Sequence, residues 1–245
     1  MNKKVVLVTG STGLGEYIIR KYAENNYDIV MTYLNHENDA KKLESEIKEK
    51  YNINTYCIKC DISKENDIIN LKNKVLEHFN KIDILINNAS IANDTTFDMK
   101  TKENFMKILE VNLVGTFLMC KYFGDIMFEN KNGNIVNISS TNGIDTYYEY
   151  SLDYDASKAG VINLSHNLAN HYAPYIRVNT ICPGWINTRM NKNMDEEFKS
   201  IEENKILLKR FANPSEIANV IYFVTSDEAS YINDSVIRVD GGKKC

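Results

Sequence analysis

The stretch that decides the fold is Thr9-Gly10-Ser11-Thr12-Gly13-Leu14-Gly15. It follows an apolar run at residues 4–8 and opens a helical stretch, so it joins a strand to a helix. The chain has only 11 glycines in 245 residues, and three of them lie in this loop. Glycine lets the backbone approach a ligand closely, and a helix N-terminus offers unpaired N–H groups and a partial positive charge. The loop therefore predicts a site for the pyrophosphate of a dinucleotide, with an ordinary glycine turn as the alternative.

Short apolar runs alternate with helical stretches along the chain. Seven runs have the length and composition of buried strands: residues 4–8, 29–33, 53–58, 84–86, 135–138, 177–181 and 235–239. The helical stretches are rich in Lys, Glu and Leu: residues 39–50, 65–79, 101–128 and 155–173. This alternation predicts an α/β fold, a doubly wound parallel sheet of about seven strands with helices on both faces. We expect it to form a single domain over residues 1–245.

The last helix has recognisable boundaries. Asn213 is placed as its N-cap, Pro214 as its first residue and Glu216 as its third, and the helix should run to about Thr225. Before it, residues 187–213 interrupt the alternation with a polar insert. A long insert near the carboxyl ends of the strands is typical of a substrate lid, which we expect here.

Composition and charge exclude several classes of protein. The chain is 43% hydrophobic and 25% charged, which excludes disordered and collagen-like chains. Its net charge of −4 disfavours nucleic acid as a main partner. No apolar run approaches the roughly 18 residues of a membrane span. The first residues carry no cleavable signal peptide, so we expect a cytoplasmic protein without a membrane partner.

Cys57 and Cys60 form a lone C-x-x-C pattern at a predicted strand. A redox pair or half of a zinc site is one interpretation of this pattern. Residues three apart on a strand face opposite sides, and no second C-x-x-C completes a metal cage. We therefore expect no metal site and treat both cysteines as small reduced core residues.

Tyr154 and Lys158 lie four residues apart in the segment YDASKAG at residues 154–160. Positions four apart share one face of a helix, so both side chains should project together. A neighbouring ammonium favours the phenolate form and is expected to lower the pKa of the tyrosine. A tyrosine tuned in this way can exchange a proton with an alcohol or a carbonyl oxygen. Taken alone, the pair is also compatible with an exposed helix that carries both residues by chance.

Further motifs occur in an order that resembles the short-chain dehydrogenase/reductase family over essentially the whole chain. Beside the glycine loop and the Tyr154/Lys158 pair, the matching segments are CDI at 60–62, NNAS at 87–90, VNL at 111–113, NISS at 137–140, PGWINT at 183–188 and VDGG at 239–242. The resemblance implies a Rossmann-type fold that binds a nicotinamide dinucleotide.

The resemblance also implies a role for each matching residue. Tyr154 would act as general acid or base, and Lys158 would bind the nicotinamide ribose and depress the pKa of Tyr154. Ser140 would hydrogen-bond the substrate carbonyl, and Asn112 would hold a water that relays protons. The residues implied in cofactor binding are Gly10, Ser11, Thr12, Gly13, Leu14, Gly15, Asn35, Asp61, Ile62, Asn88, Ala89, Ser90, Tyr154, Lys158, Pro183, Gly184, Ile186 and Thr188.

The sequence departs from the family pattern where the cofactor type is decided. The glycine loop is one residue shorter, with only Ser11 and Thr12 between its first two glycines, and the missing position often carries a basic residue in the family. NAD-binding proteins usually place an acidic residue after the second strand, where this chain has Asn35 and a later Glu37. Without that carboxylate nothing repels a 2′-phosphate. Charge complementarity therefore favours NADP(H) over NAD(H). In NNAS, Ser90 replaces the usual glycine.

Within the family, the chain looks most like 3-oxoacyl-[acyl-carrier-protein] reductases, on residues 214–218 and 226–232. This implies conversion between a carbonyl and a secondary alcohol, a small-molecule or acyl-thioester substrate, and a homotetramer formed through the long helices. The residues expected to shape the substrate pocket are Thr141, Asn142, Ile144, Tyr147, Tyr148 and Tyr150. The alternatives are an NAD-dependent sugar or small-alcohol dehydrogenase, an enoyl reductase, an epimerase or dehydratase, and a non-catalytic nucleotide-binding regulator.

Overall fold

The computed structural model describes residues 3–146, 148–188 and 194–242, and it contains one parallel sheet. The seven strands are β1 (Val5–Val8), β2 (Asp28–Tyr33), β3 (Thr55–Lys59), β4 (Ile84–Asn87), β5 (Gly133–Ile138), β6 (Ile176–Pro183) and β7 (Val236–Val239). Their order is β3-β2-β1-β4-β5-β6-β7, and every neighbouring pair is parallel. The predicted doubly wound sheet is confirmed.

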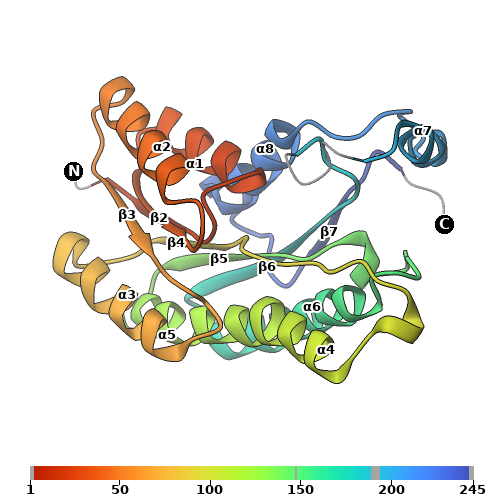
Figure 1. Cartoon of the computed structure of the whole chain (residues 1–245). Coiled ribbons are helices and arrows are strands. Elements are labelled where there is room, and N and C mark those ends of the chain that lie inside the picture. The colour runs from red at the N-terminus through yellow and green to blue at the C-terminus, as the bar shows by residue number, and fades with distance from the viewer. Residues whose placement is uncertain (1–2, 147, 189–193, 243–245) are drawn as a thin grey trace.

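Helices cover both faces of this sheet (Figure 1). One layer is made of α1 (Leu14–Glu24), α2 (Glu37–Lys50) and α8 (Pro214–Thr225). The other contains α3 (Glu65–Phe79), α4 (Lys102–Leu109), α5 (Thr116–Glu129) and α6 (Leu152–Tyr172). The helix α7 (Glu196–Lys205) lies within the polar insert. The expected helix at 101–128 is divided by a π-helical turn at Glu110–Gly115, which contains Asn112.

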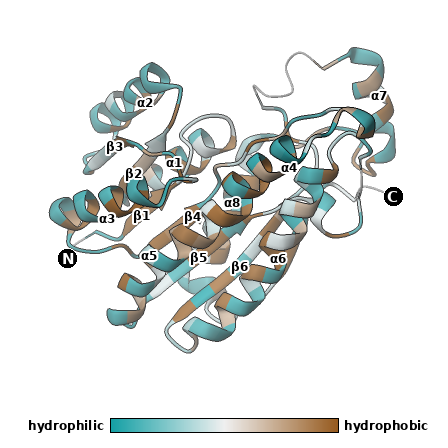
Figure 2. Ribbon diagram, turned by 60° about the horizontal axis from the view of Figure 1, so that its bottom comes forward, coloured by the Kyte–Doolittle hydropathy of each residue, from teal (hydrophilic) through white to brown (hydrophobic). Residues whose placement is uncertain are grey.

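Alternate residues of β1 belong to different hydrophobic clusters. Val6 and Val8 pack with the α1, α2 and α8 layer, whereas Val5 and Leu7 pack with the opposite layer. All four are at most 2% exposed, because helices cover the strand on both sides. Figure 2 shows the resulting concentration of hydrophobic residues along the central strands.

The two cysteines of the C-x-x-C pattern are separated in the same way. Cys57 belongs to the first cluster and Cys60 to the second, so they lie on opposite sides of the sheet. Both are free thiols, and burial raises the pKa of Cys57 to about 11 and that of Cys60 to about 12. Their placement agrees with the prediction that they are buried core residues.

The first residues of α8 are as predicted. The Glu216 carboxylate accepts a hydrogen bond from the backbone N–H of Asn213 at 2.8 Å, and Pro214 is the first helical residue. Glu216 also forms an ion pair with Arg210 at 2.7 Å, and these two contacts, Arg210 first, lower its pKa to about 2.

Residues 189–193 of the insert lie outside the described residues, so the lid remains a prediction. Among the described residues, no helix is long and apolar enough to cross a membrane.

The strand order creates a crevice where the site is expected. After β3 the chain returns across the sheet to β4, which pairs with β1 on the side opposite β2. The loops after β1 and β4 therefore leave the sheet in different directions, and ligands of such sheets bind in the crevice between them.

Candidate active site

The glycine loop after β1 is held in shape by its neighbours across the switch point. The hydroxyl of Thr9 accepts hydrogen bonds from the backbone N–H groups of Asn88 and Ala89, both at 3.0 Å. The side-chain amide of Asn88 donates to the carbonyls of Thr9 and Gly10 at 3.0 and 3.2 Å. The NNAS segment thus supports the loop from the side of β4.

Two positions in this loop favour glycine for different physical reasons. Gly13 has a φ of 60° and ψ of −124°, a conformation that residues with a side chain rarely adopt. A Cβ at Gly15 would lie 1.8 Å from the carbonyl oxygen of Gly10, so the turn could not close around it. No side chain caps the N-terminus of α1; the Gly15 N–H donates to the Thr12 carbonyl at 3.1 Å, and the helix dipole still favours an anion at this end.

A cleft of about 2500 Å³ runs from this loop to the carboxyl ends of β5 and β6. It is lined by every residue predicted to bind cofactor except Gly15, and by Ser140, Tyr154 and Lys158. Gly15 instead packs behind the loop, against Gly10 and Asn88. The cleft residues fit a dinucleotide, because they combine a glycine cradle with the N-terminus of α1 and with Ser11, whose buried hydroxyl has no partner among the described residues.

The residues that follow β2 bear on cofactor type. Leu34, Asn35 and His36 line the cleft, but Glu37 does not. The carboxylate of Glu37 instead accepts a hydrogen bond from the Tyr33 hydroxyl at 2.8 Å. The acidic residue nearest to this turn along the chain is therefore bonded to Tyr33 and does not line the cleft.

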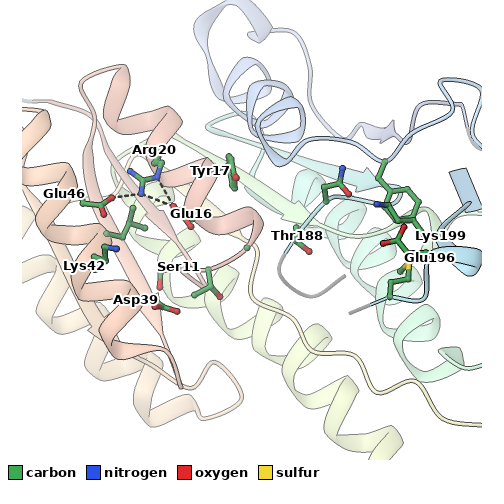
Figure 3. Close-up of a pocket in the computed structure, with 16 residues that line it drawn as sticks. Ser11, Glu16, Tyr17, Arg20, Asp39, Lys42, Glu46, Thr188, Glu196 and Lys199 are labelled. Carbon is green, nitrogen blue, oxygen red and sulfur yellow. Dashed lines mark hydrogen bonds and ion pairs between the residues drawn. The ribbon is translucent and has the colours of Figure 1, made fainter. Parts of the chain in front are cut away.

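A second, smaller cavity of about 610 Å³ lies on the other side of the glycine loop (Figure 3). Ser11 and Thr188 border both cavities. Arg20 in this cavity is paired with Glu16 at 2.9 Å and Glu46 at 2.6 Å. Its charge is thus neutralised within the protein.

Tyr154 and Lys158 project from the first turns of α6 toward the end of β5. The Nζ atom of Lys158 lies over the Tyr154 ring, 5.3 Å from its centroid, and donates to the Ile138 carbonyl at 2.9 Å. The side chain of Ser140 lies near that of Tyr154 and lowers its pKa. The structure thus brings three of the four predicted catalytic residues together in one cleft.

Burial dominates the ionisation of this group. It lowers the pKa of Lys158, which is 3% exposed, to about 8. Burial also raises the pKa of Tyr154 to about 12, a shift that Ser140 opposes and that Asp155 and Asp94 increase. The expectation that Lys158 brings the pKa of Tyr154 below its ordinary value is therefore wrong for the protein without a bound ligand, because burial raises that pKa. Tyr154 is a protonated acid at neutral pH, and Lys158 is the group that can gain or lose a proton there.

Asn112 is buried in the π-helical turn and does not line the cleft. Its side-chain carbonyl accepts from the Ile91 N–H at 2.8 Å, and its amide donates to the Ile91 carbonyl at 2.9 Å and to the Ser157 hydroxyl at 3.0 Å. Both amide N–H groups are used within the protein. The side chain therefore fixes the loop after β4, and only its oxygen could still accept a hydrogen bond from a water, so the relay role that the resemblance implied stays a prediction.

One wall of the cleft is organised by Asp155. Its carboxylate accepts from the side chains of Asn142 and Ser151, both at 2.8 Å, and from the Tyr148 N–H at 3.2 Å. Of the six residues expected to shape the substrate pocket, Thr141, Asn142 and Tyr148 line the cleft. Ile144 and Tyr150 do not line it, and Tyr147 lies outside the described residues.

Other lining residues carried no sequence signal that we used. They come from the loop after β4 and from the insert, and they include Ile91, Ala92, Asn93, Asp94, Phe198 and Glu202; Trp185 of the PGWINT segment also lines the cleft, although no role was assigned to it. The Trp185 indole donates to the Glu202 carboxylate at 2.8 Å, which joins the segment after β6 to α7. Such pairings depend on the fold, although the aromatic residues of the insert could have suggested an apolar lining.

Comparisons with known proteins agree with this arrangement. A family model described as "Enoyl-(Acyl carrier protein) reductase" matches residues 8–244. The chain is 37% identical over 241 residues to a 3-oxoacyl-[acyl-carrier-protein] reductase of Aquifex aeolicus, with 98% of this chain and 96% of that protein covered. It is 31% identical over 243 residues to an NADP-dependent mannitol dehydrogenase of Alternaria alternata, covering 98% and 91%.

Solved structures show the same fold. One described as "Crystal structure of gox2181" superposes with a TM-score of 0.92 at 28% identity, covering 98% of this chain and 95% of that one. A mutant of a Serratia marcescens short-chain dehydrogenase/reductase also gives a TM-score of 0.92, at 25% identity, covering 98% and 97%.

Proposed function

Because the chain belongs to the short-chain dehydrogenase/reductase family of oxidoreductases, we propose that it is an NADP(H)-dependent enzyme that interconverts a carbonyl and a secondary alcohol. The observation that carries this proposal is the grouping of Ser140, Tyr154 and Lys158 at one end of a cleft whose other part is the glycine loop. A single ligand spanning the cleft would contact both.

The chain's own residues have distinct tasks in this proposal. Bound NADP(H) supplies or accepts the hydride. The Ser140 hydroxyl orients the substrate carbonyl, and Tyr154, protonated at neutral pH, donates a proton to its oxygen. Lys158, with a pKa of about 8, exchanges protons near neutral pH and holds the ribose. Carbonyl reduction is the direction that a protonated Tyr154 favours.

NADP(H) is preferred over NAD(H) in this proposal on grounds of charge. The Glu37 carboxylate is engaged by Tyr33, and Leu34, Asn35 and His36 at the cleft place no negative charge against a 2′-phosphate. The buried hydroxyl of Ser11 adds a potential hydrogen-bond donor in the shortened loop. One relative, the mannitol dehydrogenase of Alternaria alternata, is named as NADP-dependent, and this name supports the same choice.

A 3-oxoacyl thioester is the substrate that the relatives favour, since those from Aquifex aeolicus and Thermotoga maritima are named 3-oxoacyl-[acyl-carrier-protein] reductases. A sugar alcohol is the second candidate, because the Asp94 carboxylate lines the cleft and can accept hydrogen bonds from hydroxyl groups. An enoyl reductase fits less well. In that branch of the family the tyrosine and lysine are usually spaced more widely than Tyr154 and Lys158.

The proposed assembly is a homotetramer formed through the long helices. Apolar side chains on this surface support it: Val114 in the π-helical turn and Phe117 at the start of α5 are both 43% exposed. Light scattering should give a particle of four chains. A stable monomer at micromolar concentration would refute the assembly without affecting the proposed chemistry.

The enzymatic proposal is tested by following nicotinamide absorbance with NADPH and NADH in parallel. The substrates are an acetoacetyl thioester, a small ketone and, in the oxidative direction, mannitol. We expect turnover with NADPH on at least the thioester. Binding of NADPH without turnover of any of these compounds would instead favour a nucleotide-binding regulator, and faster turnover with NADH would overturn the cofactor assignment.

A further inference from the structure

The segment from Ile91 to Lys100 forms one wall of the cleft yet has little regular structure. It connects β4 to α4 and contains only the short 3-10 turn η1 (Phe97–Met99). Four consecutive residues of it, Ile91 to Asp94, line the cleft that also holds Tyr154. A wall of this kind needs tertiary contacts to hold its position, because its backbone does not stabilise itself.

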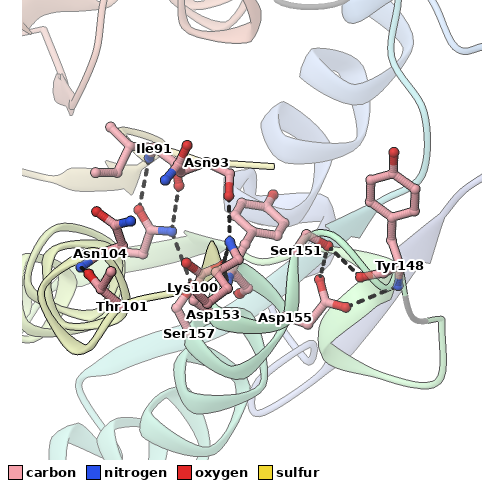
Figure 4. Close-up of polar contacts among 12 residues, drawn as sticks. Ile91, Asn93, Lys100, Thr101, Asn104, Tyr148, Ser151, Asp153, Asp155 and Ser157 are labelled. Carbon is pink, nitrogen blue, oxygen red and sulfur yellow. Dashed lines mark hydrogen bonds and ion pairs between the residues drawn. The ribbon is translucent and has the colours of Figure 1, made fainter. Parts of the chain in front are cut away.

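Three contacts hold this segment against the rest of the protein, and Figure 4 shows those at Ile91 and at Lys100. At its start, Asn112 bonds both backbone groups of Ile91. In its middle, the Thr95 N–H donates to the Tyr150 carbonyl at 3.1 Å. At its end, the Nζ atom of Lys100 forms an ion pair with Oδ1 of Asp153 at 2.8 Å and donates to the Asn93 carbonyl.

The ion pair at Lys100 is unusual in its burial. The side chain of Lys100 is 5% exposed and that of Asp153 is 0% exposed. Most other ion pairs among the described residues have a partner at least one-third exposed, as in Lys4–Asp227, where the exposures are 45% and 95%. The second oxygen of Asp153 has no hydrogen-bond partner among the described residues. A buried pair with an unsatisfied oxygen contributes little net stability compared with apolar residues of the same size.

The location of the pair suggests a role other than stability. Asp153 lies in the first turn of α6, immediately before Tyr154, and its Oδ1 also accepts a hydrogen bond from the Tyr154 N–H at 2.9 Å. One oxygen atom therefore connects the cleft wall, through Lys100, to the backbone of the proposed general acid. Lys100 in turn holds Asn93, which lines the cleft beside Asp94.

We propose that Lys100 and Asp153 are a positioning pair, which fixes the wall at residues 91–100 relative to Tyr154 and thereby sets the affinity for the carbonyl substrate. Neither residue needs to touch the substrate. The kinetic part of this inference rests on the proposed function, whereas its structural part does not. Without the ion pair, the wall would be held only weakly against α6. It would then move away from α6 and misplace Asn93 and Asp94.

The decisive variants are Lys100→Met and the double variant Lys100→Met/Asp153→Asn. The double variant leaves no unpaired buried charge, so it should fold even if the single variant is unstable. Lys4→Met is the matched control, because it removes a lysine from an exposed ion pair remote from the cleft. Each protein is examined by hydrogen exchange of the amides of residues 91–100, by NADPH titration, and by steady-state kinetics with an acetoacetyl thioester.

We expect faster amide exchange in residues 91–100 of both Lys100 variants, with exchange in the strands unchanged. The KM for the carbonyl substrate should rise about tenfold, since small displacements of positioning groups have effects of that size or more. The kcat and the dissociation constant for NADPH should stay close to those of the native enzyme. Lys4→Met should match the native enzyme in every measurement.

Other results would overturn the proposal. If the double variant has native exchange in residues 91–100 and a native KM, the pair positions nothing. If NADPH affinity falls together with substrate affinity, the pair supports the whole site rather than the wall. If the native enzyme reduces none of the carbonyl compounds, the proposed function fails, and the exchange of residues 91–100 alone decides whether the pair holds the wall.

Discussion

The Nζ atom of Lys158 lies 5.3 Å from the centroid of the Tyr154 ring and 2.9 Å from the carbonyl oxygen of Ile138. The ammonium is thus held between an aromatic face and one backbone acceptor, with almost no access to water. Desolvation of this kind disfavours the charged form, so the pKa of Lys158 falls from 10.5 to about 8. The proposed catalytic pair therefore has a cost in stability that depends on pH.

The first prediction concerns that cost. Below pH 8 the folded protein must hold Lys158 in its charged form, and this pKa shift lowers the free energy of unfolding by about 3 kcal/mol. The Lys158→Met variant avoids this cost but loses one hydrogen bond, which contributes about 1 kcal/mol. Lys158→Met should therefore be more stable than the native protein by about 2 kcal/mol at pH 7. Between about pH 8 and pH 10.5 the unfolded native chain binds the additional proton, so native stability rises and the advantage disappears.

Urea denaturation of both proteins from pH 7 to pH 10.5 measures this difference. Other ionisable groups cancel in the comparison, because they are common to both chains. A difference in unfolding free energy that does not change over this range would contradict the assigned pKa of Lys158.

Tyr154→Phe removes the proposed proton donor but keeps the ring beneath Lys158. Turnover should fall about 10²- to 10⁴-fold, the usual contribution of a general acid or base. NADPH affinity, measured by fluorescence titration, should be nearly unchanged. Tyr150→Phe is the matched control, since Tyr150 lies four residues earlier and does not line the cleft. An active Tyr154→Phe enzyme would exclude the mechanism.

Asn112→Ala should destabilise the protein by about 2–3 kcal/mol, because it leaves both part-buried backbone groups of Ile91 without these bonds and removes the bond that the Ser157 hydroxyl accepts. It should also accelerate hydrogen exchange at the start of the loop after β4. Asn167→Ala, on the exposed side of α6, removes an amide whose partner among the described residues is Asn163, and it should change stability little. Equal losses in both variants would argue against a positioning role for Asn112.

Alanine substitutions at Gly13 and Gly15 should have different physical effects on the glycine loop. A Cβ at Gly13 meets nothing closer than Thr188 at 3.9 Å, so Gly13→Ala carries only backbone strain of about 1–3 kcal/mol. A Cβ at Gly15 meets the Gly10 carbonyl at 1.8 Å, and the loop must move. Loss of one or two charge-assisted hydrogen bonds to phosphate should then weaken NADPH binding about tenfold or more in Gly15→Ala. Isothermal titration calorimetry measures the NADPH affinity of both variants. Tighter NADPH binding by Gly15→Ala than by Gly13→Ala would contradict this prediction.

Several local features of this protein could be predicted from its sequence. The seven strands follow from short apolar runs, and the boundaries of α8 follow from Asn213, Pro214 and Glu216. The strand–loop–helix at residues 5–24 follows from clustered glycines, and the shared direction of Tyr154 and Lys158 follows from helical spacing. The opposite burial of Cys57 and Cys60 follows from the two-residue period of a strand. All of these depend on interactions between residues close in the chain.

Only the tertiary structure decided how these parts meet. The pKa of Tyr154 depends on burial, which the whole fold creates, and burial outweighs the effect that the nearby lysine suggested. The bonds of Asn112 to Ile91 and of Lys100 to Asp153 join residues 21 and 53 positions apart. No periodic pattern records which distant polar groups will be enclosed together. Their pairing is settled when the loop after β4 packs against α6 and water is excluded from both.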